Sequence, residues 1–258
     1  MKRLLSFFLF CVLGVVGTLA QHPKLLLTKE ELGYMKQHMN EVPAFGRVVD
    51  DLLQKADEAC AAAIQIPTPV DGGGGAVHEQ HKSNYYAMFH AGLAYQYTGH
   101  KKYADFVAQM LMEYAQKYPK WGLHPVNLSP VPGRLFWQTL NESVWLVHTA
   151  MAYDCVYDAL SAKQRKFIEK NLLFNMADFI MNGYGDCKGN HEMFNRMHNH
   201  ATWATSAVGM VGMTTGNQSL VRKALYGTDE TGKKGGFLRQ MDHLFSPDGY
   251  YTEGAYYQ

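Results

Sequence analysis

The sequence has few cysteines and no excess of charge of either sign. It contains four cysteines in 258 residues. Cys60, Cys155 and Cys187 follow the N-terminal apolar run and have the spacing of neither a disulfide framework nor a zinc site. Cys60 and Cys155 lie on apolar helical faces, so we expect buried thiols. Lys plus Arg total 24 and Asp plus Glu total 23, a formal net charge of +1. No overall field therefore favours nucleic acid or an anionic membrane surface, and an anionic ligand must be held by a local site.

No hydrophobic run is long enough to suggest a membrane-spanning helix. The apolar run Leu4–Val16 is short for that purpose. It follows a Lys-Arg pair and precedes Gly17–Ala20, which are residues suited to cleavage after Ala20. Residues 1–20 are therefore predicted to be a signal peptide and residues 21–258 an exported domain, periplasmic or secreted, with no membrane association after cleavage.

Strand-like alternation of apolar and polar residues is also absent, which predicts an all-α fold. Thr28 with Glu31, and Ser161 with Gln164, form capping boxes ahead of apolar residues at helical spacing. The same spacing predicts further helices over residues 45–64, 83–98, 101–118, 141–160, 201–213, 219–226 and 237–245. The short connections between them favour antiparallel helical hairpins.

Three connections interrupt the helical pattern, and one of them, residues 228–236, is predicted to be a surface loop. Residues 67–76 are rich in glycine but lack the Lys-Ser/Thr of a phosphate loop, which predicts a flexible loop followed by a turn that contains His78 and His81. Residues 121–136 form a long loop with three prolines that leads into the next helix. Because long irregular loops in compact helical domains are often functional, this loop is a candidate wall of a site.

The densest group of polar side chains is Asn195–His200, which opens an apolar helix. We pair it with the tyrosine-rich stretch Asp248–Tyr257 near the end of the chain. Buried polar groups are costly unless they are hydrogen-bonded, so the group is either a satisfied internal network or one wall of a cleft. His198 and His200 are two positions apart and point to different sides of a helix, so no metal site is predicted.

Two kinds of chemistry remain open from the residues alone. A glycoside hydrolase needs a pair of carboxylates, and the candidates are Glu142, Glu192, Asp248 and Glu253. Alternatively, His200 with a tyrosine of the terminal stretch, beside amide and guanidinium donors, suits proton abstraction next to a carboxylate. The donors would stabilise the enolate-like charge while the phenol moves a proton.

Four segments together resemble a known family. Residues 134–142 (RLFWQTLNE), 152–154 (AYD), 199–203 (NHATW) and 248–257 (DGYYTEGAYY) resemble the helical domain of the alginate-lyase and heparinase II/III group of polysaccharide lyases. The nearest resemblance is to the oligo-alginate lyases of polysaccharide lyase family seventeen. It covers essentially all of the chain after the signal peptide. It implies an incomplete α/α toroid of antiparallel hairpins that, in the family, is followed by a mainly antiparallel β domain, with uronate chains bound between the two.

The resemblance also implies an activity and a set of site residues. The activity is cleavage of a uronic-acid polysaccharide, most closely alginate or oligo-alginate, by β-elimination to unsaturated uronate products. Asn199 and His200 would hold and neutralise the substrate carboxylate, and Tyr256 would protonate the leaving oxygen. Tyr257 is the rival for that acid role, and the candidate sugar contacts are Gln138, Asn141, Glu142 and Tyr257. The implied partner is an anionic polysaccharide or oligosaccharide, and no cofactor is expected within this chain.

The sequence departs from the family pattern at its end. The chain stops at Gln258, inside its own motif, with no counterpart of the β domain that contributes to the family's active site and carries a metal. We therefore expect a truncated toroid domain. A glycoside hydrolase that depends on Glu142 or Asp248 stays open as an alternative, as does a sugar-binding fragment without turnover that depends on Trp121, Trp137 and Trp203.

Overall fold

The regular structure of the protein is helical. The computed structural model describes residues 22–39, 41–126, 128–183 and 189–254. Over these residues the β pairing is limited to an isolated bridge between Phe245 and Tyr251. The predicted all-α class is confirmed, whereas closure into a toroid stays a prediction. The signal peptide predicted over residues 1–20 and Cys187 lie outside the described residues.

In chain order the α-helices are α2 (Lys29–His38), α3 (Pro43–Ala61), α4 (Ala76–Thr98), α5 (Lys101–Lys117), α6 (Thr139–Val156), α7 (Ala162–Ile168), α8 (Phe174–Asn182), α9 (Gly189–Phe194), α10 (Asn199–Thr215), α11 (Gln218–Tyr226) and α12 (Phe237–Leu244). Two 3₁₀ turns, η1 (Tyr118–Lys120) and η2 (Tyr157–Ala159), extend α5 and α6, and a π-helical turn, η3 (Glu169–Leu173), joins α7 to α8. No helix in the described part of the chain is long and apolar enough to cross a membrane.

Both predicted capping boxes are present. Thr28 Oγ1 accepts a hydrogen bond from the Glu31 amide at 3.2 Å, and the Glu31 carboxylate accepts one from the Thr28 amide at 2.8 Å. Ser161 and Gln164 make the same reciprocal pair at the start of α7. Each pair satisfies two of the amide donors that a helix leaves open at its first turn.

The prediction of a turn around His78 and His81 was wrong, because α4 begins at Ala76 and includes both residues. The carboxylate of Asp71 accepts hydrogen bonds from the amides of Val77, at 2.9 Å, and His78, at 2.8 Å, and so caps the helix from outside the usual capping position. Both imidazoles are buried, and burial lowers the pKa of His81 to about 4. The first turns of α4 bury polar side chains, which hid the helix from a search for apolar periodicity.

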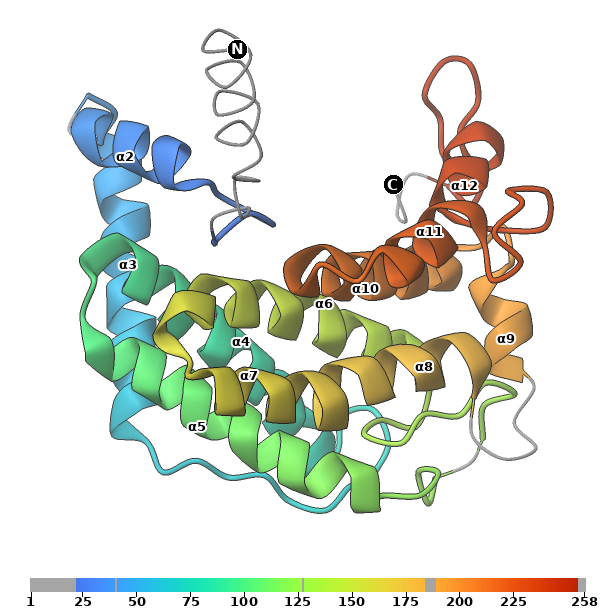
Figure 1. Cartoon of the computed structure of the whole chain (residues 1–258), viewed down its shortest axis with the longest axis horizontal. Helices are drawn as coiled ribbons and strands as arrows, with labels where there is room; N and C mark the ends of the chain where they lie inside the picture. The colour runs from blue at the N-terminus through green and yellow to red at the C-terminus, as the bar shows by residue number, and fades with distance from the viewer. Residues whose placement is uncertain (1–21, 40, 127, 184–188, 255–258) are drawn as a thin grey trace, which may run out of the picture.

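Helices α4, α6 and α10 form the inner layer of the fold. They lie side by side and cross the molecule in the same direction, with their N-terminal ends toward the region that carries α9 (Figure 1). Helices α5, α8 and α11 run back in the opposite direction, which gives the predicted antiparallel hairpins (Figure 1). Helix α6 has buried residues all around its circumference, as expected for a helix covered on every side.

The core lies between these two layers. Its largest fully buried side chains include Tyr114, Phe136, Trp145 and Tyr153. Cys155 on α6 is also buried and makes no disulfide, and burial raises the pKa of its thiol to about 12. Cys60 is a half-buried free thiol. Neither cysteine therefore has the exposed thiolate that redox or nucleophilic chemistry requires.

Candidate active site

The long loop of residues 121–138 is fixed to the helices by the buried guanidinium of Arg134. Its Nε and Nη2 donate to the carbonyl of Trp121 at 3.0 and 2.6 Å, and Nη2 also donates to the carbonyl of Tyr118 at 2.9 Å. Nη1 donates to Asn175 Oδ1 at 2.9 Å, and the guanidinium lies over the Tyr118 ring, 4.5 Å from its centroid. This one side chain therefore ties the loop to η1 and to α8.

Glu142 anchors the same loop from the side of α6. Its Oε1 accepts from the Tyr118 hydroxyl at 2.6 Å, and its Oε2 accepts from the amides of Arg134, Leu135 and Phe136 at 2.9, 3.0 and 3.3 Å. The residue is 0% exposed, and burial raises the pKa of its carboxyl despite these hydrogen bonds.

This burial corrects the expected role of Glu142. A carboxylate with no exposed surface and four internal donors has no face left for a sugar hydroxyl or a glycosidic oxygen. Glu142 therefore does not fit the predicted sugar-binding wall, and it does not fit the acid of a hydrolase. Asp248, the other carboxylate of the hydrolase alternative, is exposed.

Gln138 and Asn141 stand together at the start of α6. Gln138 is the residue that precedes the first turn, and its Nε2 donates to Asn141 Oδ1 at 3.0 Å. Both residues are half-buried. This bond uses the amide nitrogen of one residue and the carbonyl oxygen of the other, and it leaves the Gln138 carbonyl and the Asn141 amide nitrogen for a ligand.

The two polar stretches that the sequence paired meet at the start of α10. Glu253 Oε2 accepts three hydrogen bonds, each 2.9 Å long, from the Asn199 backbone amide, the Asn199 side-chain Nδ2 and the Tyr251 hydroxyl. Glu253 Oε1 lies 3.3 Å from His198 Nε2. The polar group is therefore a hydrogen-bonded network at the open end of a helix.

His198 is the N-cap of α10, a position usually taken by Ser, Thr, Asp or Asn. Its backbone is extended (φ −162°), and its Nδ1 accepts from the amide of His200 at 3.2 Å. The rings of His198 and His200 meet edge to face, with centroids 4.7 Å apart. The cap therefore also orders the ring of His200, the residue with the candidate acid-base role.

The charges of this network follow from its contacts. Burial raises the pKa of Glu253, but hydrogen bonds from Asn199 and Tyr251 outweigh that effect, so its pKa is lowered and it is ionised at neutral pH. Burial and the hydrogen bond to Glu253 raise the pKa of Tyr251 to about 12. Burial and the neighbouring His198 lower the pKa of His200, against the opposing effect of Glu253. His200 is therefore a neutral imidazole, and its Nδ1 is buried without a hydrogen-bond partner among the described residues.

The inner helices bring the candidate residues to one end of the fold. Gln138 and Asn141 begin α6, Asn199 and His200 begin α10, and the two helices run in the same direction (Figure 1). Helix N-termini carry amide donors and partial positive charge, which favour an anion. At α10 the ionised Glu253 already accepts from the first amide and offsets part of this charge. Tyr256 and Tyr257 follow Glu253 within a few positions in the sequence and lie outside the described residues.

The described residues contain no group of three or more His, Cys, Asp or Glu side chains arranged to hold a metal ion.

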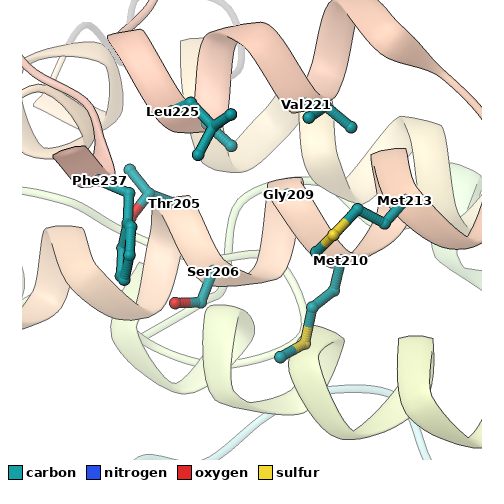
Figure 2. A pocket seen from close by; sticks show the side chains of 9 residues that line it. Thr205, Ser206, Gly209, Met210, Met213, Val221, Leu225 and Phe237 are labelled. Carbon is teal, nitrogen blue, oxygen red and sulfur yellow. The ribbon is translucent and has the colours of Figure 1, made fainter. Parts of the chain in front are cut away.

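A separate pocket of about 290 Å³ lies further along α10, where α11 and α12 cover it. Figure 2 shows Met210 and Met213 of α10 on one side, and Leu225 of α11 and Phe237 of α12 on the other. Its apolar walls suit a hydrophobic group and not a charged uronate.

The network at α10 contains residues that the sequence did not single out for this role. Glu253 was a candidate only as one of several carboxylates, and His198 only as a metal ligand. Glu253 is 54 positions from Asn199, so no local pattern joins them. One feature of the sequence could have identified Glu253: it is a carboxylate within the tyrosine-rich stretch that was paired with Asn195–His200.

Comparison with known proteins places the chain in a family. The alginate lyase family model matches residues 36–254. The chain belongs to the alginate lyase family. This match confirms the resemblance found in the sequence, and it includes Gln138, Asn141, Asn199, His200 and Glu253.

Two relatives of this alginate lyase family chain are informative. The exo-oligoalginate lyase of Saccharophagus degradans is 44% identical over 237 residues, which cover 92% of this chain and 31% of that protein. The alginate lyase of Stenotrophomonas maltophilia is 49% identical over 197 residues, which cover 76% of this chain and 26% of that protein. The chain therefore spans about a third of the length of the first relative and about a quarter of the second.

Proposed function

We propose that this chain is the helical part of a polysaccharide lyase that cleaves alginate or oligo-alginate by β-elimination and releases unsaturated uronate. The observation that carries the proposal is the start of α10, where an ionised Glu253 holds Asn199 beside a neutral His200. Membership of the alginate lyase family and the names of its two relatives support the substrate class. The partner is an anionic polysaccharide or oligosaccharide.

The first chemical requirement is to offset the charge of the substrate carboxylate, because the C5 proton is only weakly acidic while that charge is uncompensated. Asn199 Nδ2 has two hydrogens, and Glu253 takes one of them, so the other can donate to the carboxylate. The N-terminal end of α10 adds partial positive charge at the same place, of which the ionised Glu253 offsets a part. Gln138 and Asn141 at the start of α6 are the proposed sugar contacts.

The second requirement is proton transfer at two atoms. A base removes the C5 proton, the electron pair forms the C4–C5 double bond, and the C4–O bond breaks while an acid protonates the leaving oxygen. His200, neutral because of its burial, is a candidate base, and a group from outside this chain is the other. Tyr256 is the proposed acid, because a phenol with an ordinary pKa of about 10 carries its proton at neutral pH. Tyr256 is three residues from Glu253, a span of at most about 11 Å of chain.

Ultraviolet absorbance of the unsaturated product tests the proposal, since a lyase creates the double bond and a hydrolase does not. In a protein that joins this chain to the β domain of the family, His200→Ala and Tyr256→Phe should each lower kcat by about 10²-fold or more, the usual scale for a lost acid or base. Tyr257→Phe should cost much less, and Tyr250→Phe is the matched control, because Tyr250 is an exposed tyrosine (57%) of the same stretch.

Three results would contradict the proposal. The first is release of sugar from alginate without ultraviolet absorbance, which would indicate hydrolysis. The second is near-normal release of unsaturated product by Tyr256→Phe, which would remove the phenol from the reaction. The third is tight binding of oligo-alginate with no turnover even when the chain is joined to the β domain that the family carries, which would indicate a sugar-binding module.

We also propose that the protein is exported to the periplasm or beyond. The support is the charged start, the apolar run and the small residues that end at Ala20. Intact-mass analysis of protein recovered from the cell envelope should show Gln21 as the first residue. Protein that retains Met1 in the cytosol would contradict the proposal.

A further inference from the structure

The Glu253 carboxylate has partners on both of its oxygens at the start of α10. The Tyr251 hydroxyl and two donors of Asn199 converge on Oε2, while His198 Nε2 lies against Oε1. Tyr251 itself is buried, and its bridge to Phe245 fixes the backbone two residues before Glu253. The carboxylate therefore has one orientation, set by partners on both of its oxygens.

We propose that Glu253 is a positioning residue for the lyase reaction, which presents the Asn199 amide to the substrate carboxylate. The inference rests on the proposed function. An asparagine amide that is free to turn offers a carboxylate either its NH₂ group or its carbonyl oxygen, and only the NH₂ group can donate. Because an ionised carboxylate only accepts hydrogen bonds, Glu253 selects the rotamer in which Nδ2 faces it and the second N–H remains available.

The bond to the backbone amide of Asn199 strengthens this selection. One oxygen accepts from both the main chain and the side chain of Asn199, so the position of the amide is fixed relative to the helix end. The preorganised donor then loses no rotational freedom when the substrate binds. Glu253 is thus expected to act through Asn199 without contacting the substrate.

A double-mutant cycle between Glu253 and Asn199 tests the proposal. Glu253→Ala should lower kcat/KM for oligo-alginate by about 10- to 100-fold, the scale of one hydrogen bond to a charged group. The same substitution in the Asn199→Ala background should change kcat/KM by less than about 3-fold, because the group on which it acts is already gone. Glu230→Ala is the control, since Glu230 lies in the loop after α11 and pairs with the exposed Arg222 of that helix.

The conservative variant separates orientation from folding. Glu253→Gln retains a carbonyl oxygen that can accept from Asn199, so it should keep more activity than Glu253→Ala. If Glu253→Ala does not fold, the cycle is run with Glu253→Gln, whose effect should again vanish in the Asn199→Ala background. Equal effects of the Glu253 substitution in both backgrounds would show independent action and would overturn the proposal.

Failure of the proposed function gives a different result. If the wild-type chain yields no unsaturated product, hydrogen exchange at the Asn199 backbone amide, which donates to Glu253, becomes the readout. Exchange that is faster in Glu253→Ala than in the wild type, and restored by Glu253→Gln, would support the positioning of Asn199. Unchanged exchange would overturn it.

Discussion

Replacing Glu142 by alanine should destabilise the fold strongly, because its carboxylate is the shared acceptor of one hydroxyl and three backbone amides. All four donors would lose their partner at a position that is 0% exposed. A buried donor left unsatisfied costs about 1 kcal/mol or more. Release of the buried charge offsets part of this cost, so we expect a loss of about 3–5 kcal/mol.

A loss of this size is a large fraction of the usual stability of a domain, about 5–15 kcal/mol. It should lower the midpoint of thermal unfolding by roughly 10 °C, since each kcal/mol shifts a domain of this size by about 2–4 °C. Glu142→Gln keeps an acceptor for the loop amides and removes the charge, so its loss should be about 1–2 kcal/mol. Circular dichroism during heating gives the midpoint of thermal unfolding of both variants, and urea titration gives their free energy of unfolding.

The pH dependence gives a second signature of the same carboxyl. Its pKa is raised in the fold, so its contribution to stability is fully present below the ordinary value of 4.5 and is lost as pH rises through the folded pKa. Glu142→Gln should remove this dependence. An alanine variant within 1 kcal/mol of the wild type would refute the reasoning, because it would mean that the four donors find other partners.

Two further predictions concern stability. A Cβ at Gly133 would overlap the carbonyl oxygen of Phe136, so Gly133→Ala should cost about 2 kcal/mol in urea unfolding, whereas Gly122→Ala, with open space around it, should cost little. Burial raises the pKa of Asp154, but hydrogen bonds that include one from His22 at 2.6 Å outweigh this and lower it. Its stabilisation should be present above the ordinary value of 3.8 and be lost as pH falls from there through the folded pKa. Asp154→Asn should remove that loss in urea midpoints measured between about pH 2 and 5. Equal stability of Gly133→Ala and Gly122→Ala would contradict the first prediction. A steep loss of stability at acid pH that persists in Asp154→Asn would contradict the second.

The order of the helices could be predicted from the sequence, because the signals for a helix act over a few residues. The capping boxes at Thr28 and Ser161 each join positions three apart, and Gly99 ends α4 in the left-handed conformation (φ 73°). The prediction failed at the start of α4, where the capping carboxylate of Asp71 is several residues away and the buried face carries histidines. A search for apolar residues at helical spacing cannot detect a helix whose buried face is polar.

Only the tertiary structure decided the roles of the carboxylates. Glu142 belongs to a segment that carries the family resemblance, from which a sugar contact was expected. The packing of the 121–138 loop instead places its side chain in the core. Glu253 belongs to a tyrosine-rich stretch with no local sign of a partner, yet its carboxylate meets Asn199 across 54 positions. Solvation and hydrogen bonding set what a carboxylate can do, and both depend on which distant segments surround it. The sequence by itself determined most of the helices and the residue types at the start of α10. The packing of the segment around Tyr251 and Glu253 against α10 determined which of those residues are hydrogen-bonded to one another.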